Sequence, residues 1–388
     1  MPATGPATNH AAADRCPGVL RLAKAADGYL ARVRLPGGLI GAGEMRVLGS
    51  LASELGDGRV ELTSRGNVQL RGLETDAAGP LSDELSRAGL FPSPSHDLVR
   101  NVLASPLAGL DGGPDLTAIV RSLDAGLCAR ARLAQLPGRF LFAVDDGRSD
   151  VADLSADVLA EIRAEGAVVN GLAIGGSGRD RATAADVVTV MLACAEAFLD
   201  VRAAEGGTAW RIADLTDGPA RIGAAVATRL GLAAAPQPSR SPDGPASRPV
   251  GVVGPAGTAA VLLAPLGRLN TTQAAWLADH VRGRPARITP WRSVVLPDLA
   301  DAAGLIRDAA GLGFGVDAAS PWLRVTACAG RPGCASALAD VQADAAAFAA
   351  RWPDRIVHVS GCARHCGRPA ATQVDVTASS EGYQVAGV

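Results

Sequence analysis

The strongest chemical signal in this 388-residue sequence is a group of cysteines near its C-terminus. Cys328 and Cys334 are separated by five residues in TACAGRPGC, and Cys362 and Cys366 by three in SGCARHCG. Pairs of thiolates on two returning loops suit an iron–sulfur cluster, which needs four converging sulfurs. The glycines in both motifs permit tight loops whose backbone N–H groups can face the sulfurs. We therefore expect these four cysteines to bind one cluster.

Two other interpretations of these cysteines stay open. A structural zinc site uses the same ligand type, but its paired cysteines are usually two to four residues apart, so the loop from Cys328 is wide for zinc. Unligated core cysteines are the second alternative. Cys128 and Cys194 lie in apolar helical patterns and are expected in the core, whereas Cys16 carries no functional signal. The five histidines show no metal-ligand spacing, and the sequence assigns no catalytic acid or base.

The composition excludes several classes of function. A net charge of −2 provides no broad positive field for nucleic acid, and 3% aromatic residues provide no base-stacking platform. The longest apolar run, residues 250–267, is interrupted by Pro255 and Pro265, so no membrane-spanning helix is expected. The N-terminus lacks the order of a secretory signal. We expect a cytoplasmic protein, in which a content of seven cysteines favours metal or redox chemistry over a disulfide framework.

The chain divides into two parts that resemble each other. Residues 233–249 are rich in Pro, Ser and Gly and predict a linker. Before it, we expect a strand and Gly turn at 29–38, a helix at 44–54 and a strand at 60–73; after it, a strand and turn at 258–270, a helix at 271–281 and a strand at 286–299. Thr63 and Thr289 occupy matching places. Further on, 102–109 resembles 323–330, and 136–147 resembles 352–361.

These motifs together resemble the nitrite/sulfite reductase superfamily, from about Cys16 to Val388. The resemblance rests on the two cysteine pairs, the repeated halves and the segments RVRLPGG, ELTSRGNVQLRG and RNVLASPLAG. It implies an α+β fold, a pseudo-twofold repeat of ferredoxin-like half-domains and sirohaem-binding-type α/β half-domains around one [4Fe-4S] cluster. The implied domains are a tail (1–14), ferredoxin-like half-domain 1 (15–92), α/β domain 1 (93–232), the linker (233–249), ferredoxin-like half-domain 2 (250–316) and the iron–sulfur-binding α/β domain 2 (317–388).

The resemblance also assigns substrate-binding residues. The basic tetrapyrrole-binding positions of the family match Arg32, Arg65 and Arg100 in this chain. Gln69 matches a polar position of the family in the same strand. The chemistry is reasonable on its own terms, because tetrapyrroles carry carboxylates and the arginine fork binds a carboxylate through two hydrogen bonds. A solvated strand residue is the alternative for each of these arginines.

Within the superfamily, the sequence is most similar to precorrin-3B synthases. Reducers of sulfite and nitrite have two cations where this chain has Arg139 and Leu141, and Arg364 replaces the usual Asn between the last two cysteines. The resemblance therefore implies an iron–sulfur monooxygenase that hydroxylates C20 of precorrin-3A with O2 and forms a γ-lactone. It implies a reductase or ferredoxin as electron donor, NADH as the ultimate reductant, and an additional iron centre or sirohaem as a further cofactor. A sirohaem-dependent sulfite or nitrite reductase is the alternative.

Overall fold

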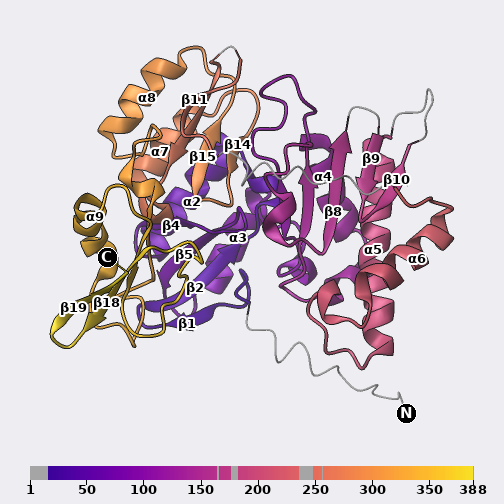
Figure 1. Ribbon diagram of the computed structural model, residues 1–388, viewed down its shortest axis with the longest axis horizontal. Helices are drawn as coiled ribbons and strands as arrows, with labels where there is room; N and C mark the ends of the chain where they lie inside the picture. Colours follow the sequence, from indigo (N-terminus) through magenta and orange to yellow (C-terminus); the bar gives the residue numbers. More distant parts are fainter. Residues whose placement is uncertain (1–15, 164–165, 176–181, 236–247, 256, 388) are drawn as a thin grey trace. The chain divides into compact units, whose positions relative to one another are not determined.

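The computed structural model describes residues 16–163, 166–175, 182–235, 248–255 and 257–387 (Figure 1). The chain forms two compact units. Unit 1 is drawn from residues 1–18, 34–39 and 91–247, and unit 2 from residues 19–33, 40–90 and 248–388. Within the described residues, no helix is both long and apolar enough to cross a bilayer.

Unit 1 is a five-stranded sheet packed against helices, here called sheet C. The strand order is β10-β9-β8-β7-β6, in which β6, β7 and β8 are parallel, whereas β9 is antiparallel to both β8 and β10. Its strands are β6 (Val102–Ala104), β7 (Phe142–Asp145), β8 (Val158–Arg163), β9 (Gly166–Val169) and β10 (Leu172–Ile174). Its helices are α4 (Thr117–Cys128), α5 (Ala184–Ala204) and α6 (Gly218–Leu230).

Helix α5 is the centre of the unit 1 core. It is apolar around much of its circumference, which is the pattern of a buried helix. Phe198 on this helix contacts Phe140, with ring centroids 4.9 Å apart, and Phe140 in turn meets Phe142 of β7 edge-on at 5.2 Å. Cys194 is completely buried among these side chains, which confirms its expected core position. Cys128, at the end of α4, is only partly buried.

Unit 2 contains two five-stranded sheets that exchange an edge strand. Sheet A has the order β1-β2-β5-β4-β13, and sheet B the order β11-β12-β15-β14-β3. The strands of sheet A are β1 (Ala23–Ala25), β2 (Gly28–Val33), β5 (Val68–Leu73), β4 (Arg59–Leu62) and β13 (Arg268–Asn270). Those of sheet B are β11 (Gly251–Val253), β12 (Ala259–Leu263), β15 (Ser293–Leu296), β14 (Ala286–Ile288) and β3 (Leu39–Ile40). Each half of the repeat thus completes the sheet of the other.

The helices of these half-domains pack on the apolar faces of the sheets. They are α2 (Ala42–Leu55), α3 (Ala78–Arg87), α7 (Thr271–His280) and α8 (Ala302–Gly311). Helix α2 buries Met45, Leu48 and Ala52, the three- and four-residue spacing of one helical face. Gly49 of α2 and Ala274 of α7 allow a close approach, because a Cβ at Gly49 would lie 3.4 Å from that of Ala274.

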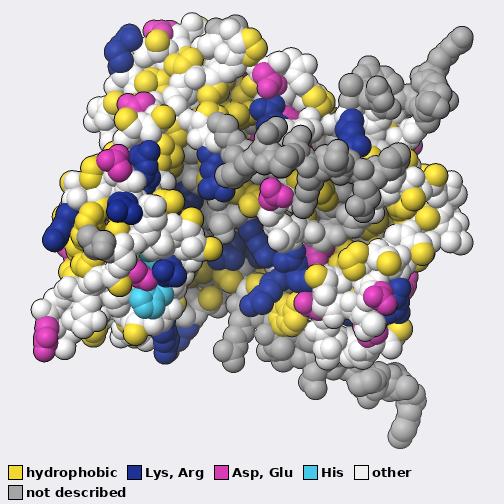
Figure 2. All heavy atoms as spheres, in the orientation of Figure 1, with side chains coloured by type: hydrophobic (Ala, Val, Ile, Leu, Met, Phe, Trp, Pro, Cys, Tyr) yellow, Lys and Arg dark blue, Asp and Glu magenta, His cyan; other side chains and the backbone are white. Residues whose placement is uncertain are grey.

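The C-terminal part of unit 2 is a smaller sheet, sheet D, with the order β16-β17-β18-β19. Its strands are β16 (Val325–Ala327), β17 (Val357–Ser360), β18 (Val374–Ser379) and β19 (Gly382–Ala386), and α9 (Val341–Arg351) connects the first two. The first three strands are parallel and β19 is antiparallel to β18. Sheet D therefore repeats the arrangement of β6 to β9. Figure 2 shows acidic, basic and hydrophobic side chains interspersed over α8 and α9.

These findings confirm the predicted α+β class and its pseudo-twofold repeat, with a change in register. The first residue of β6, Val102, pairs with Phe142, and the first residue of β16, Val325, pairs with Val357. Val102 thus corresponds to Val325, two positions beyond the ungapped match of 102–109 with 323–330. The predicted domain boundaries stay predictions, since residues 1–15 and 236–247 lie outside the described residues. Ala233 and Ala235, at the start of the predicted linker, form hydrogen bonds to Ala173 and Gly171 beside β10.

The strands expected at 60–73 and 286–299 are each a hairpin, so that prediction was wrong in both halves. Thr63 and Thr289 begin the two turns, and each threonine hydroxyl accepts the N–H of the residue four positions later, Asn67 at 3.1 Å and Ser293 at 3.1 Å. Within the turns, Gly66 and Arg292 both have positive φ values, which break the extended run. The alternation of apolar and polar residues continues through both turns, and for this reason the sequence pattern predicted a single strand in each half.

The turn at Thr289 offers a test of the fold. Thr289 and Ser293 are 1% and 0% exposed, and their hydroxyls lie 2.7 Å apart. Thr289→Val keeps the shape but leaves the hydroxyl and N–H of Ser293 without this partner. We expect the free energy of unfolding, measured in urea, to be about 1–3 kcal/mol lower for this variant than for the wild type. The exposed control Thr258→Val should change the unfolding free energy by less than about 0.5 kcal/mol. Equal effects of the two variants would contradict the assigned turn.

Candidate functional site

The predicted cysteine ligands lie on two loops at one edge of sheet D. Cys328 directly follows β16, and Cys362 follows β17, its parallel neighbour. The carboxyl ends of adjacent parallel strands meet at one sheet edge, which is where open α/β sheets bind ligands. Cys334 and Cys366 extend the same two loops. Cys328, Cys334 and Cys362 are partly buried and Cys366 is exposed.

Hydrogen bonds join the two cysteine loops. The N–H of Gly361 donates to Sγ of Cys328 at 3.1 Å, and the N–H of Leu338 donates to the carbonyl of Gly361 at 2.8 Å. A Cβ at Gly361 would lie 2.7 Å from that of Ala337, so only glycine fits between the loops. A backbone N–H directed at a thiol sulfur is the kind of contact that tunes an iron–sulfur site.

The fit to a cluster lies in the donor chemistry and in the placement of the loops. Four thiols, no carboxylates, lie in two hydrogen-bonded loops at one sheet edge. Among the described residues, no three His, Cys, Asp or Glu side chains converge closely enough to hold a metal ion. The structure therefore brings the two loops together without gathering the four sulfurs into a ligand set, and the cluster assignment stays a prediction.

His358 of β17 lies beneath these loops. It is completely buried, and its Nδ1 lies 2.8 Å from Oγ1 of Thr326 on β16. Its Nε2 is buried and makes no hydrogen bond of normal geometry to a described residue. Burial lowers the pKa of His358 to about 4, although the charge of Asp375 and the backbone of Cys366 act in the opposite direction. The imidazole is therefore neutral at physiological pH.

Two of the predicted substrate residues lie together on the polar face of sheet A. Arg32 of β2 and Gln69 of β5 are paired in register, and Nη2 of Arg32 donates to Oε1 of Gln69 at 3.1 Å. Nε2 of Gln69 donates to Oε2 of Glu61 at 2.5 Å, on the next strand. Arg65 lies in the turn between β4 and β5, where its N–H donates to Oγ1 of Thr63 at 3.3 Å. The sequence-based choice thus includes neighbours on one face and its adjoining turn.

Arg100 has a different environment. It belongs to unit 1, is 4% exposed, and donates to both carboxylate oxygens of Asp124, from Nε at 2.7 Å and from Nη2 at 2.8 Å. Burial acts to lower the pKa of Arg100, but the hydrogen bond to Asp124 raises it overall. The structure thus gives Arg100 a structural partner, and its contact with substrate stays a prediction.

The residues that distinguish this chain from anion reducers also have clear positions. Leu141 is 2% exposed and packs in a small apolar cluster with Leu103, Ala143 and Val151. The Arg139 side chain is exposed and lies over the ring of Trp210, 5.5 Å from its centroid. Arg364 is exposed in the second cysteine loop. Position 141 therefore contributes to an apolar core, not to a charged surface.

Unit 1 carries a counterpart of the cysteine site without cysteines. Ser105 follows β6 as Cys328 follows β16, and its Oγ accepts the N–H of Asp146 at 3.2 Å, as the Cys328 sulfur accepts that of Gly361. The Ser105 hydroxyl donates to Asp150 at 2.6 Å. Burial raises the pKa of Asp150 to about 6, against the effect of this hydrogen bond. The same backbone frame thus holds a serine and a carboxylate in unit 1.

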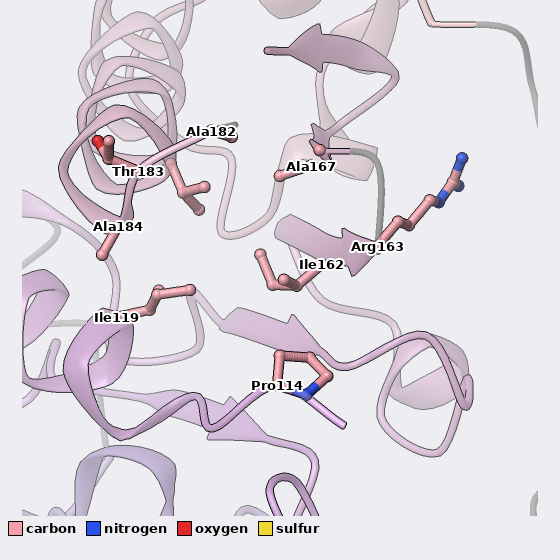
Figure 3. Close-up of a pocket in the computed structure, with 10 residues that line it drawn as sticks. Pro114, Ile119, Ile162, Arg163, Ala167, Ala182, Thr183 and Ala184 are labelled. Carbon is pink, nitrogen blue, oxygen red and sulfur yellow. The ribbon is translucent and has the colours of Figure 1, made fainter. Parts of the chain in front are cut away.

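A cavity of about 160 Å³ lies elsewhere in unit 1 (Figure 3). It is bordered by the start of α4, the β8–β9 hairpin and the start of α5. Ile119 and Ile162 extend toward each other, whereas Arg163 points away. No predicted site residue lines it.

Sequence reasoning missed Arg71 and Gln342, which donate to the loop of Cys328 and Cys334, and Arg268, which donates to Gln342. They lie far from the cysteines in the sequence or outside any motif. A usable signal existed for Arg71, which lies two positions after Gln69 on the same strand face.

The comparisons with known proteins agree with the fold. Residues 22–88 match the nitrite/sulfite reductase ferredoxin-like half-domain family, which spans β1 to α3 here. A precorrin-3B synthase of Sinorhizobium sp. is 27% identical, over 99% of this chain and 85% of that protein. The structure of Mycobacterium tuberculosis NirA superposes with a TM-score of 0.72, over 92% of this chain and 73% of that chain, at 22% identity.

Two reductases match over shorter segments. A ferredoxin–nitrite reductase of Synechococcus elongatus is 31% identical over 31% of this chain and 25% of that protein. A ferredoxin-dependent sulfite reductase of Mycobacterium tuberculosis is 31% identical over 34% of this chain and 24% of that protein. The predicted resemblance to the nitrite/sulfite reductase superfamily, and to precorrin-3B synthase within it, is confirmed.

Asp150 provides a pH test of the unit 1 counterpart. Its pKa of about 6 in the folded protein exceeds the value of about 3.9 in an unfolded chain. The folded state then binds more protons between about pH 4 and 6, so stability falls as the pH rises through this window. Asp150→Asn removes this titration. We expect the wild type to lose about 2 kcal/mol more unfolding free energy than Asp150→Asn between pH 4 and 7.

The matched control for this experiment is Asp308→Asn, at an exposed position of α8. It should leave the pH dependence of unfolding the same as in the wild type. Parallel curves for Asp150→Asn and the wild type would show that the Asp150 carboxyl does not titrate in this window.

Proposed function

We propose that this chain, which has the fold of the nitrite/sulfite reductases, is a precorrin-3B synthase. The observation that carries the proposal is the extent of the similarity. The match to the Sinorhizobium precorrin-3B synthase covers 99% of this chain, whereas the matches to the nitrite and sulfite reductases cover about a third. The nitrite and sulfite reductases are oxidoreductases by name, and the proposal concerns the particular substrate of this chain.

The proposed reaction inserts one atom of O2 into precorrin-3A as a hydroxyl group at C20. The ring-A acetate closes a γ-lactone, and the second oxygen atom leaves as water. Two electrons are required, which a reductase or a ferredoxin supplies in the cytoplasm, with NADH as their source. The protein contributes binding and orientation of the macrocycle, because the redox chemistry belongs to the cofactors.

Cys328, Cys334, Cys362 and Cys366 would hold the [4Fe-4S] cluster. When bound, a cluster of this type supplies single-electron transfer. The donor set, the bonded loops and the N–H of Gly361 directed at Sγ of Cys328 support this assignment. The buried His358 is neutral and adds no charge of its own beneath the loops, and the additional iron or sirohaem remains part of the proposal.

The polar face of sheet A would bind carboxylates of the tetrapyrrole. Arg32 and Gln69 lie in register on neighbouring strands, and Arg65 lies in the turn that follows β4. Each guanidinium can donate two parallel hydrogen bonds to one carboxylate, which orients the ligand as well as attracting it. Arg100 would require its bidentate pair with Asp124 to rearrange before it contacted the substrate.

The environment of Leu141 supports a tetrapyrrole substrate over an inorganic anion. An anion reducer of this superfamily is expected to have a cation at this position. Here the side chain is 2% exposed in an apolar cluster, where a charged group would be strongly disfavoured. A sirohaem-dependent sulfite or nitrite reductase is the second candidate, favoured by the two reductase matches of 31% identity.

One experiment separates these two candidates. Protein purified without oxygen is examined by visible and electron paramagnetic resonance spectroscopy, with iron and sulfide counts, and is then given precorrin-3A, reductant and O2. A cluster signal without a haem band, and a hydroxylated lactone formed with one O2 consumed per product, are expected. A sirohaem band with sulfite or nitrite reduction and no precorrin turnover would establish the reductase instead. Protein that holds no iron would exclude both.

Arg65→Ala tests the binding face. Loss of one charge-assisted hydrogen-bonding group should weaken precorrin-3A binding about tenfold, corresponding to about 1.5 kcal/mol. The iron content should be unchanged, because Arg65 lies in the turn between β4 and β5 and is not part of either cysteine loop. Binding is measured by titration of the macrocycle absorbance.

Arg284→Ala is the control for this variant. Arg284 forms a bidentate pair with Asp298 in the same unit and is assigned no role in binding. Its affinity for precorrin-3A should equal that of the wild type. If Arg65→Ala also binds as tightly as the wild type, the assignment of Arg65 to substrate is wrong.

A further inference from the structure

Arg71 joins sheet A to the first cysteine loop. It lies on β5, and its side chain is only 11% exposed. Nε and Nη2 donate to the two carboxylate oxygens of Asp27 at 3.0 and 2.9 Å, and Nη2 also donates to the carbonyl of Gly333 at 2.9 Å. Gly333 directly precedes Cys334. Although burial acts to lower it, the bond to Asp27 raises the pKa of Arg71, so the guanidinium stays charged.

A second connection leads to Cys328. Arg268 of the exchanged strand β13 is hydrogen-bonded from Nη1 to Oε1 of Gln342, on α9. Nε2 of Gln342 donates to the carbonyl of Cys328 at 3.1 Å. Gln342 therefore uses its oxygen toward sheet A and its nitrogen toward the cysteine. An amide is the side chain that can both accept and donate in this way.

Arg268 belongs to a row of polar side chains on sheet A, here called the polar row, which also contains Glu61, Gln69 and Arg32. Its Nε lies 3.1 Å from Oε1 of Glu61, which is opposite it in register. Glu61 accepts from Gln69, and Gln69 accepts from Arg32. Burial lowers the pKa of Arg268, and Glu61 acts in the opposite direction. A continuous series of contacts thus crosses four strands and ends at the backbone of Cys328.

The strand pairing of the repeat does not require Arg32 and Gln69. Arg32 and Gln69 are paired across two strands of sheet A, and the corresponding pair in sheet B is Val261 and Val295. Both valines are buried, at 2% and 0% exposure. Two apolar residues therefore satisfy the same strand pairing in the other half of the repeat. At the position that corresponds to Glu61, sheet B has the buried Arg287, so the two sheets differ in kind at Arg32 and Gln69. In sheet A, the row continues through Arg268 and Gln342 to the carbonyl of Cys328.

We infer that Arg71 and Gln342, the latter held by Arg268, are positioning residues that clamp the backbone of the first cysteine loop at two points, Gly333 and Cys328. The inference rests on the proposed function only in taking these cysteines as cluster ligands. The clamp holds the carbonyls and leaves the thiols to the cluster. Loss of either contact lets its own part of the loop open without unfolding the unit.

Amide hydrogen exchange of the full-length chain, followed by mass spectrometry of peptides, tests the clamp. Gln342→Met removes both hydrogen bonds, and Gln342→Glu keeps an acceptor for Arg268 but loses the donor to Cys328. Both variants should speed exchange in the peptide containing Cys328 about five- to tenfold, the effect of one lost hydrogen bond. Arg71→Met should act by a similar factor in the peptide containing Cys334. Exchange in the β18–β19 hairpin should be unchanged.

Two matched controls accompany these variants. Gln384→Met replaces an exposed glutamine of β19, and Arg284→Met breaks a bidentate pair away from the loops. Neither should alter exchange in the cysteine loops. Exchange at the wild-type rate in Gln342→Glu would overturn the inference, because altered packing of α9 would then explain the effect of Gln342→Met. An equal increase in every peptide would also overturn it, because global destabilisation would then explain the faster exchange.

Cluster-loaded protein provides a second measurement. Iron release to a chelator should be about five- to tenfold faster in Gln342→Met and Arg71→Met than in the wild type or the controls. Unchanged release in both variants would overturn the clamp. Protein that binds a cluster but does not convert precorrin-3A would refute the proposed function and leave the clamp standing, since neither measurement uses the tetrapyrrole.

Discussion

The exchange of strands β3 and β13 between sheets A and B determines what the polar face of sheet A can contact. Strand β13 comes from the second half of the repeat, yet it pairs with β4 of the first half. This pairing brings Arg268 opposite Glu61, where its remaining donors reach Gln342 of the C-terminal part. Without the exchange, sheet A would end at β4, and no side chain of β13 would join its polar row to α9. The candidate site therefore depends on the repeat as a folded pair.

The repeat also shows how one backbone arrangement can serve two purposes. Ser105 and Cys328 occupy the same position after a parallel strand, and each accepts an N–H from the neighbouring loop through its side chain. The frame thus specifies a small side chain that can accept a hydrogen bond, and not a metal ligand as such. At this position after the strand, unit 2 has the thiol of Cys328 and unit 1 has the hydroxyl of Ser105. A cluster needs the frame and the other cysteines together.

Sequence reasoning succeeded where the signal was local and failed where it was not. Cysteine spacing identified both loops, and the repeated elements indicated the fold class, because such patterns depend on residues a few positions apart. The turns at Thr63 and Thr289 were missed, since alternation runs through them. Arg71 and Gly333 are separated by 262 positions, and Arg268 and Gln342 by 74. Contacts of this kind are properties of the tertiary fold, which spacing alone does not report.

The comparison of the two sheets shows why such contacts are informative. A partly buried polar side chain is costly unless its hydrogen bonds are satisfied, and Val261 and Val295 avoid that cost at the positions of sheet B that correspond to Arg32 and Gln69. Retaining Arg32 and Gln69 in sheet A requires Glu61 and Arg268 to complete the row. The row is consequently a unit in which each charge depends on the next. Its connection to Gln342, and through Gln342 to the backbone of Cys328, therefore depends on Arg268 staying in the row.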